Sequence, residues 1–207
     1  MIKVVCLDLD GVLFEKVHEN LIQNLSQKFN IEEEELKDIL FVKAAEEGGY
    51  NELKKGTIEP SQYWNWLFAE LGTDADFTKE DYINELHKGY HINPKAIELI
   101  NILRSNGIRT ALCSNNYKDN IEALEKKFSL SNYFDVIAFS YEIGALKPDK
   151  KIFEELVSRA KVKPEEIVYS DDNEAKLAGA KEIGIKTFVF KNFEQFKKEL
   201  SNLGVET

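Results

Sequence analysis

The chain has 207 residues, of which 43% are hydrophobic and 31% are charged, and its formal net charge is −10. These values are typical of a globular protein with one domain, or with one domain that carries an insert, and they exclude a disordered or fibrous chain. No basic run is longer than a pair of lysines. A nucleic-acid backbone is therefore not expected as a partner.

The first residues, Met1 to Phe14, are apolar but include Asp8 and Asp10. A signal peptide has an uninterrupted apolar stretch, and so does a membrane span of about 20 residues. Neither is expected here. We therefore predict a cytoplasmic protein that binds no membrane.

Five short apolar runs predict the strands of a sheet, and they are Val4–Leu9, Arg109–Cys113, Val136–Phe139, Ile167–Ser170 and Thr187–Phe190. Runs that are apolar on both faces indicate parallel strands buried between helices. Amphipathic helices are predicted between the later strands, over Pro94–Asn106, Asn120–Phe128, Lys150–Ala160 and Glu174–Ile183. This alternation predicts an α/β fold with a Rossmann-like parallel sheet and helices on both faces.

The interval from residue 15 to residue 90 breaks the alternation and predicts an inserted all-α cap. Helical spacing is seen at Val17, Leu21, Leu25 and Phe29, and it continues over Glu32–Glu47, Pro60–Leu71 and Thr78–Gly89. Thr78 and Asp81 are spaced as a capping pair at a helix start. We expect residues 1–14 and 91–207 to form the α/β core and residues 15–90 to form the cap. Ligands of such sheets bind beyond the carboxyl ends of the strands, where this insert leaves the core.

The first strand runs into Asp8-Leu9-Asp10-Gly11, which places two carboxylates on one face of an extended segment. Two buried carboxylates this close together cannot easily both be ionised. They are therefore expected either to share a proton or to bind a cation. One of them can then act as a nucleophile and the other as a general acid and base. A simple turn or helix cap is the alternative interpretation of an isolated Asp-x-Asp-Gly.

Polar residues follow three later strands as well. Ser114 and Asn115 follow the second strand, Lys147 follows the third, and Asp171 and Asp172 close the fourth. A hydroxyl and backbone amides can hold phosphate oxygens, and adjacent acids after a buried strand are good ligands for a hard cation. Four carboxylates with one lysine would repel a phosphate, so the electrostatics require a divalent cation. Oxygen ligands favour Mg²⁺.

In this order the motifs resemble those of the haloacid dehalogenase superfamily, and the matching residues are Asp8-Leu9-Asp10-Gly11, Ser114-Asn115, Lys147-Pro148 and Asp171-Asp172. The resemblance covers nearly the whole chain. It includes a cap inserted after the first strand, in which Lys54-Lys55-Gly56-Thr57-Ile58 looks like a stretch often seen in caps of this family.

The resemblance implies a chemical role for each catalytic and phosphate-binding residue. Asp8 would form an aspartyl-phosphate, and Asp10 would protonate the leaving group and then activate water. Ser114 and Asn115 would bind the phosphate. Lys147 would steady both the nucleophile and the phosphate.

The resemblance also implies a Mg²⁺ site. Asp8, the backbone carbonyl of Asp10, and Asp171 would hold the ion, with Asp172 in or next to the metal shell. Similar enzymes usually have Asn four residues after the second acid, where this chain has Lys176. That departure leaves the local hydrogen bonding and the substrate open.

These features predict a Mg²⁺-dependent phosphatase whose partner is a small phosphate ester, such as a sugar phosphate. The dehalogenases that name the family lack an acid at the position of Asp10, because a halide needs no proton, so this residue favours phosphate esters. A phosphomutase resembling β-phosphoglucomutase shares the intermediate and is one alternative. A phosphorylatable receiver is another, although its acceptor Asp lies on a middle strand, where this chain has Ser140-Tyr141-Glu142. An inactive binding protein that kept the fold is a third.

The cysteines and histidines are interpreted more simply. Cys6 and Cys113 lie in apolar runs and match no spacing of metal ligands, so they are expected to be buried packing residues, with redox sensing as the alternative. The histidines match no pair of metal ligands, so His18, His87 and His91 are all expected to be packing or solvated residues. Of the three, His18 is near enough to the first strand to contact a substrate.

Overall fold

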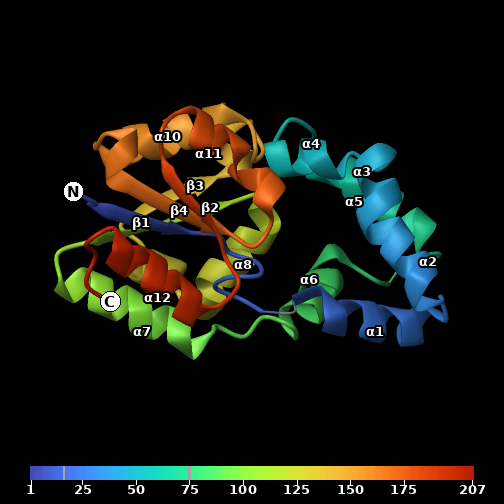
Figure 1. The fold of residues 1–207 in the computed structure, drawn as a ribbon. Coiled ribbons are helices and arrows are strands. Elements are labelled where there is room, and N and C mark those ends of the chain that lie inside the picture. Colours follow the sequence, from blue (N-terminus) through green and yellow to red (C-terminus); the bar gives the residue numbers. More distant parts are fainter. Residues whose placement is uncertain (16, 74–75) are drawn as a thin grey trace.

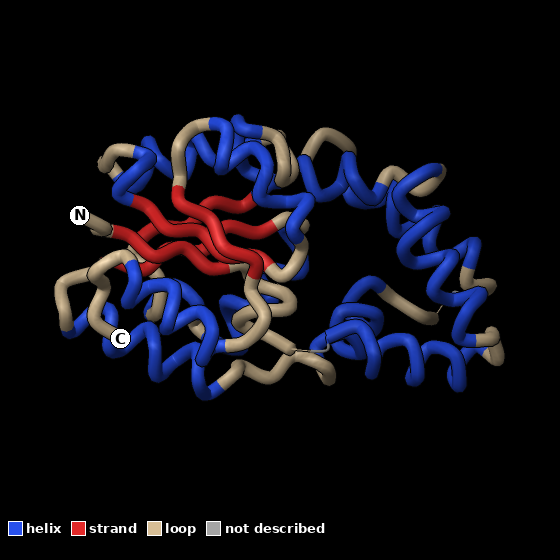
Figure 2. Tube along the Cα trace, viewed as in Figure 1, coloured by secondary structure: helices blue, strands red, loops and turns tan. Residues whose placement is uncertain are grey.

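The computed structural model describes residues 1–15, 17–73 and 76–207, and within them the centre of the molecule is a five-stranded parallel sheet in the order β3-β2-β1-β4-β5. Its strands are β1 (Val4–Leu7), β2 (Arg109–Ser114), β3 (Val136–Phe139), β4 (Ile167–Asp171) and β5 (Lys186–Val189). All residues of β1 and β4 are buried, as expected for strands that are apolar on both faces. Figure 2 shows the strands in red between two layers of helix.

The strand order places the topological switch point beside β1. From β1 the chain runs outward through β2 to β3, and it then returns to the other side of β1 to form β4 and β5. In open α/β sheets, ligands bind at such a point beyond the carboxyl ends of the strands. The parallel register pairs Leu7 with Leu112 and with Ser170. Asp8 and Asp171, one residue further along, therefore lie side by side.

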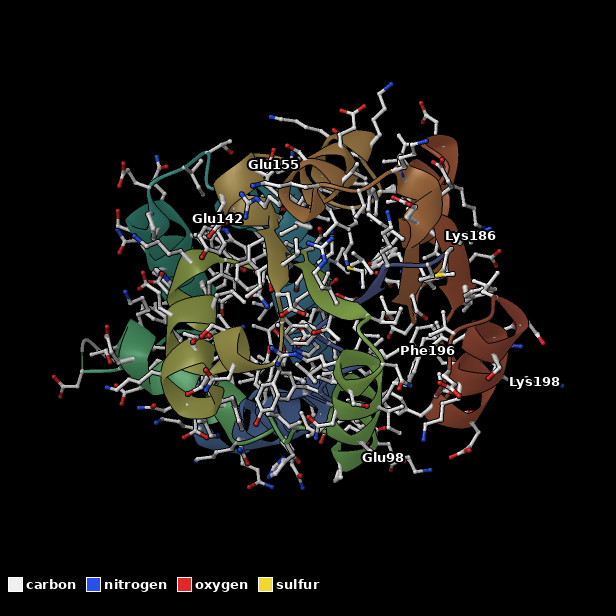
Figure 3. The ribbon with its side chains drawn as sticks, turned by 90° about the vertical axis from the view of Figure 1, so that its left-hand side faces the viewer. Glu98, Glu142, Glu155, Lys186, Phe196 and Lys198 are labelled. Carbon is white, nitrogen blue, oxygen red and sulfur yellow. The ribbon has the colours of Figure 1, made fainter. Side chains whose placement is uncertain are left out.

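Helices cover both faces of the sheet (Figure 1). The helices α10 (Lys150–Ala160) and α11 (Ala178–Glu182) lie on one face, and α7 (Pro94–Ser105), α8 (Lys118–Phe128) and α12 (Phe193–Asn202) lie on the other. Short helical segments complete the core: η2 (Leu130–Asn132), α9 (Ser140–Ile143), η3 (Pro164–Glu166) and η4 (Glu174–Leu177). Figure 3 shows Phe196 on the inner side of α12, whereas Lys198 points outward.

Alternate residues of β1 contribute to two separate hydrophobic clusters. Val4 and Cys6 pack with α10 and α11, while Val5 and Leu7 pack with α7, α8 and α12. This alternation follows from the two-residue period of a strand. The cluster that contains Val5 and Leu7 continues without interruption to Trp64, which lies among the inserted helices.

Between Phe14 and α7, the described residues form helices and no strand. These helices are α1 (Val17–Phe29), α2 (Glu33–Lys37), the π-helix η1 (Asp38–Lys43), α3 (Ala44–Glu46), α4 (Tyr50–Lys55), α5 (Pro60–Glu70) and α6 (Lys79–His87). Thr78 and Asp81 exchange hydrogen bonds at the start of α6, which confirms the predicted capping pair. Among the described residues, none of the helices is long and apolar enough to cross a membrane.

The first strand is shorter than predicted, because it ends at Leu7 and not at Leu9. The Leu9 carbonyl instead accepts hydrogen bonds from the Leu13 and Phe14 amides, at 3.0 and 2.9 Å, so a tight turn follows Asp8 directly. Gly11 has a φ of +83° in this turn, and a Cβ atom there would lie 2.1 Å from Asp172 Oδ2. The backbone conformation therefore favours glycine here, and a larger residue would also have to displace the Asp172 side chain.

Other differences are small or concern short elements. The predicted helix over Glu32–Glu47 is interrupted by the π-helical turn η1, and the predicted helix over Glu174–Ile183 begins as the 3₁₀ turn η4. The elements α4, α9 and α12 lie outside the predicted ones. In α12, Phe193, Phe196 and Leu200 recur at helical spacing, so the sequence does carry a signal for this helix.

Candidate active site

A buried lysine joins two aspartates at the carboxyl edge of β1 and β4. Lys147 Nζ lies 2.7 Å from Asp8 Oδ1 and 2.8 Å from Asp171 Oδ2. It also donates hydrogen bonds to the Cys113 carbonyl at 3.1 Å and to the Tyr169 hydroxyl at 2.9 Å. A lysine can be buried when its charge is paired and its protons are all used, as they are here. The structure thus brings together three of the residues that the sequence singles out.

Asn115 holds the backbone of this lysine. Its Oδ1 accepts a hydrogen bond from the Lys147 amide at 2.7 Å, and its Nδ2 donates to the Lys147 carbonyl at 3.1 Å. Ser114, the last residue of β2, is buried beside it. Since the Asn115 side chain supports Lys147, the predicted contact of Asn115 with phosphate depends on its backbone amide.

Three carboxylates form a group that suits a hard cation. Asp8, Asp171 and Asp172 each offer an oxygen, and these oxygens all lie within 4.8 Å of one another. Lys147 contacts Asp8 Oδ1 and Asp171 Oδ2, which leaves Asp8 Oδ2 and Asp171 Oδ1 on the other side of the cluster. An all-oxygen set fits Mg²⁺ better than zinc or copper.

A second lysine approaches the cluster from that other side. Lys176, in η4, places its Nζ 3.7 Å from Asp8 Oδ2 and 3.8 Å from Asp171 Oδ1, and 31% of its side chain is exposed. The sequence marks this residue as a departure from the family pattern. The pattern alone does not show that the Lys176 ammonium group faces both Asp8 and Asp171.

The acids of the cluster differ in their pKa values. Burial raises the pKa of Asp8 to about 7, although Lys147 opposes the shift. Burial likewise raises the pKa of Asp10 to about 6, against the hydrogen bond from the Tyr90 hydroxyl. Burial also acts to raise the pKa of Asp171, but Lys147 and Lys176 outweigh it and lower the value to about 2. A cation bound at Asp8 would favour its ionised form.

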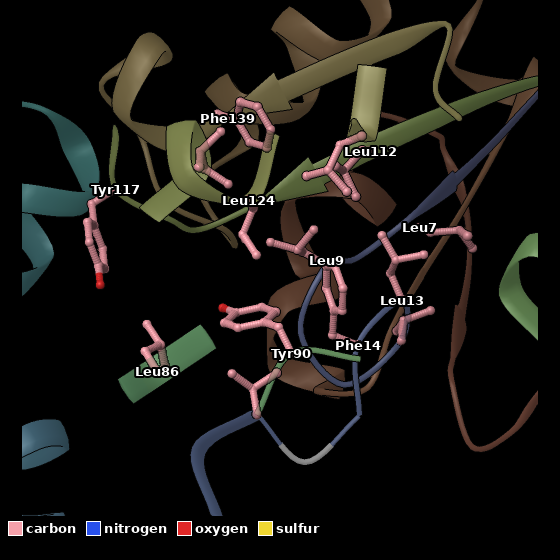
Figure 4. Packing of buried hydrophobic residues seen from close by; sticks show 14 of the residues in the cluster. Leu7, Leu9, Leu13, Phe14, Leu86, Tyr90, Leu112, Tyr117, Leu124 and Phe139 are labelled. Atoms are coloured by element: carbon pink, nitrogen blue, oxygen red, sulfur yellow. The ribbon is translucent and has the colours of Figure 1, made fainter. Parts of the chain in front are cut away.

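One oxygen of Asp10 is available to a ligand. Asp10 Oδ1 is buried and has no hydrogen-bonding partner among the described residues, whereas the Tyr90 hydroxyl interacts with the same carboxyl group. Asn120 Nδ2 donates to that hydroxyl at 3.2 Å, which leaves the hydroxyl proton free for donation to Asp10. Asn120 Oδ1 in turn pairs with His87 Nε2 at 2.7 Å. The Tyr90 ring packs edge-on against Phe14, with their centroids 4.8 Å apart (Figure 4).

A cavity of about 310 Å³ opens beside these acids, and it is lined by Asp10, Gly11, Val17, His18, Glu19, Asp172 and Lys176. His18 Nδ1 is buried without a hydrogen-bonding partner in the described part of the chain, and burial lowers the pKa of this ring. As expected from the sequence, His18 is a histidine that lies next to the acids.

Sequence reasoning did not single out Tyr90, Asn120 or Tyr169, and it expected His87 only to be a packing or solvated residue. Tyr169 has a readable signal, because a hydroxyl two residues before Asp171 shares its face of β4. Asn120 is at least 30 residues from His87 and Tyr90 in the chain, and these side chains meet only after folding.

The cysteines are packing residues, as predicted. Cys6 and Cys113 are both buried and free. Burial raises the pKa of Cys6 well above its usual value and that of Cys113 to about 12. A thiol that stays protonated is a poor nucleophile, so redox sensing is disfavoured.

Comparison with known proteins agrees with this geometry. The family model of haloacid dehalogenase-like hydrolases matches residues 2–184. The chain belongs to this family. The resemblance drawn from the four motifs is thereby confirmed, and the protein is a haloacid dehalogenase-like hydrolase.

Individual relatives include phosphatases. The chain is 30% identical to D-ribitol-5-phosphate phosphatase of Bacteroides thetaiotaomicron, over 69% of this chain and 62% of that protein. It is 26% identical to bifunctional epoxide hydrolase 2 of Mus musculus, over 98% of this chain but only 39% of the mouse protein. The hydrolase therefore spans less than two thirds of either relative.

Solved structures share the fold. A HAD family enzyme from Bacteroides thetaiotaomicron superposes with a TM-score of 0.78 at 25% identity, covering 96% of this chain and 98% of that one. Another crystal structure of that enzyme contains magnesium and inorganic phosphate, and it superposes with a TM-score of 0.74 at 24% identity, over 92% and 95% of the two chains.

Proposed function

We propose that this hydrolase is a Mg²⁺-dependent phosphatase, which removes phosphate from a small phosphorylated metabolite through an aspartyl-phosphate on Asp8. The observation that carries the proposal is that two acids with different surroundings, Asp8 and Asp10, lie on the same turn. Asp8 is anchored by Lys147, and Asp10 presents a buried Oδ1 without a partner among the described residues. The relative named for D-ribitol 5-phosphate, and the neighbour crystallised with magnesium and phosphate, support the same conclusion.

The reaction has two halves. In the first, a carboxylate oxygen of Asp8 bonds to phosphorus, the bond from phosphorus to the leaving oxygen breaks, and Asp10 gives its proton to that oxygen. In the second, Asp10 takes a proton from water, the water oxygen bonds to phosphorus, and the bond to Asp8 breaks. The products are an alcohol and inorganic phosphate. A pKa of about 6 suits Asp10 to both steps near neutral pH.

The proposed metal ligands are the carboxylates of Asp8 and Asp171, the carbonyl of Asp10, and Asp172 in or beside the shell. The oxygens of the three carboxylates lie close enough together for a shared ion. Bound Mg²⁺ would supply positive charge against the acids and the phosphate. Asp171, whose pKa is about 2, is ionised and ready to bind a cation at neutral pH.

The proposed phosphate contacts come from the side of β1 where β2 and β3 lie, whereas Asp171 and Asp172 come from the side of β4. Ser114 is the last residue of β2 and Asn115 follows it, while the Lys147 ammonium group reaches Asp8 from the turn between α9 and α10. Hydroxyls, amides and a fixed ammonium group are suitable donors to phosphate oxygens. The pairing of Asn115 with Lys147 keeps this side of the site rigid.

We also propose that residues 15–90 form a cap over a core of residues 1–14 and 91–207, and that the cap carries substrate selectivity. His18 of α1 lines the cavity beside Asp10. On the other side, the Ser140 hydroxyl donates a hydrogen bond to the Lys54 carbonyl at 2.6 Å, which ties α4 to α9.

The test is a panel of phosphate esters, including sugar phosphates, nucleotides and phosphorylated organic acids, assayed with Mg²⁺ and with EDTA. Wild-type protein should release inorganic phosphate only with Mg²⁺, and Asp8→Asn should release none, because an amide cannot attack phosphorus. Full turnover in chelator, or activity of Asp8→Asn close to that of the wild type, would refute the proposal. Transfer of phosphate to a second sugar instead of water would favour the phosphomutase.

A further inference from the structure

The two lysines of the site divide the oxygens of Asp8 and Asp171 between them. Lys147 contacts Asp8 Oδ1 and Asp171 Oδ2 at 2.7 and 2.8 Å. Lys176 faces the remaining oxygen of each acid, at 3.7 and 3.8 Å. These longer distances describe a charge that faces the acids without a close hydrogen bond.

The oxygens that face Lys176 do not contact Lys147, and each has a lone pair to offer a cation, although Asp171 Oδ1 also accepts a hydrogen bond from the Asn173 amide at 3.0 Å. Lys147 already holds the other oxygen of each acid, and it is fully buried among fixed partners. A metal ion bound to Asp8 Oδ2 and Asp171 Oδ1 would therefore lie beside the Lys176 ammonium group. Two positive charges that close together repel each other strongly in a partly buried site.

The charge of Lys176 faces the acid cluster from the side that Lys147 leaves open. Its Nζ lies 3.7 Å from Asp8 and 3.8 Å from Asp171, and its side chain lines the same cavity as Asp10 and Asp172. In the metal-free protein, Lys176 thus supplies part of the positive charge that a bound cation would supply.

The Lys176 ammonium group can also move away from the acid cluster, whereas that of Lys147 cannot. The Lys176 side chain is 31% exposed and lines the open cavity, whereas that of Lys147 is 0% exposed. A lysine with a flexible four-carbon stem can move its ammonium group into solvent at low cost when a second cation arrives.

We propose that Lys176 is an internal counter-cation that competes with Mg²⁺ for Asp8 and Asp171. It stabilises the acid cluster when no metal is bound, and it lowers the affinity of the site for Mg²⁺. The inference rests on the proposed function, since it requires Mg²⁺ to bind at these acids.

The test compares wild-type protein with Lys176→Met and Lys176→Gln, two neutral variants of similar length. Lys181→Met is the matched control, because Lys181 lies on the neighbouring α11, is 52% exposed, and pairs only at 4.0 Å with Glu174. Mg²⁺ alone is titrated into metal-free protein by calorimetry. Both neutral variants should bind Mg²⁺ roughly tenfold more tightly than the wild type, as expected for the loss of one nearby charge, and the control should bind as the wild type does.

Thermal unfolding gives a second readout, which a merely structural role of Lys176 would not produce. In EDTA, both neutral variants should melt below the wild type, because Lys147 is then the one nearby lysine, among the described residues, left to offset the charge of Asp8 and Asp171. Saturating Mg²⁺ should raise their melting temperatures more than that of the wild type, so the gap closes or reverses.

The possible outcomes separate this inference from the proposed function. Equal Mg²⁺ affinity in the wild type and both neutral variants would overturn the competition while leaving the phosphatase intact. No Mg²⁺ binding by any of them would overturn the metal site and the inference together. A raised KM for a phosphate ester, with unchanged Mg²⁺ affinity, would assign Lys176 to the substrate and also overturn the competition.

Discussion

The acid cluster has a closed side and an open side, which differ in how their polar groups are satisfied. On the closed side, Lys147 is fully buried and lies within 2.8 Å of Asp8 and Asp171. On the open side, Asp10 Oδ1 and His18 Nδ1 are buried and lack a hydrogen-bonding partner among the described residues. A buried polar group without a partner costs free energy, which a bound ligand can recover.

This difference separates two tasks. The closed side keeps its geometry whether or not substrate is present, because its contacts are made within the chain. The open side gains its contacts only with a ligand. We therefore expect changes on the closed side to cost stability and turnover together, and changes on the open side to affect turnover more than stability.

The largest effect is expected from Lys147→Met on the closed side. This substitution leaves Asp8 and Asp171 buried side by side without their shared counter-charge. Breaking a buried ion pair in this way costs about 3 to 5 kcal/mol. Urea unfolding should show that loss, and turnover should vanish. The exposed Lys181→Met should change the free energy of unfolding very little, and a loss of similar size in both variants would contradict the comparison.

The next effect is expected from Asp10→Asn on the open side. An amide cannot donate the proton that the leaving oxygen needs, so turnover of alkyl phosphates should fall by about 10²- to 10⁴-fold. Aryl phosphates, whose leaving groups need less help, should lose less. Steady-state kinetics with one ester of each kind, at saturating Mg²⁺, measures the difference. Equal losses on both esters would indicate that Asp10 serves metal geometry instead.

The sheet and the acid cluster were predictable because their signals are local. Runs that are apolar on both faces predicted the five strands to within two residues at each end. The register then brings the residues after β1 and β4 to one edge. The error at Leu9 has a simple cause, since an apolar residue after a strand looks like more strand. The turn is set by Gly11, whose positive φ no apolar pattern records.

The open side was less predictable, because its contacts depend on how distant segments pack. The pairing of Asn120 with Tyr90 and His87 joins α8 to the chain on either side of Gly89. No spacing within the sequence encodes it. Likewise, Lys176 was visible as a departure from the family pattern, but its approach to Asp8 follows from the course of η4 after β4.

The pH dependence of stability gives a third test, again on the open side. Burial raises the folded-state pKa of Asp10 from 3.8 to about 6. Because the folded state favours the protonated acid, this contribution to stability is fully present below pH 4 and is lost as the pH rises through 6. In EDTA, the wild type should therefore lose about 2 kcal/mol relative to Asp10→Asn between pH 4 and pH 7. Urea unfolding at several pH values measures both proteins, and parallel curves would contradict the raised pKa.

The smallest effect is expected from Tyr90→Phe, which tests how Asp10 is held on the open side. The Tyr90 hydroxyl interacts with Asp10 and accepts from Asn120 Nδ2. Without it, the Asp10 carboxyl can rotate, so proton transfer to the leaving oxygen should slow while substrate binding is retained. We expect kcat for an alkyl phosphate to fall by about tenfold, as is typical when one orienting hydrogen bond is lost, with KM unchanged.

The expected change in stability is modest, because Asn120 Nδ2 keeps a second acceptor in Asn116 Oδ1 at 3.0 Å. We estimate a loss of about 1 kcal/mol for one buried hydrogen bond. Tyr82→Phe is the matched control, since Tyr82 is also buried but packs against Trp64 in the inserted helices, with their ring centroids 5.4 Å apart. If Tyr90 positions Asp10, its variant should slow alkyl esters more than aryl esters, and the control should slow neither. A Tyr90→Phe variant that raised KM, or that slowed both esters equally, would make Tyr90 a packing residue and would leave Asp10 oriented by the turn alone.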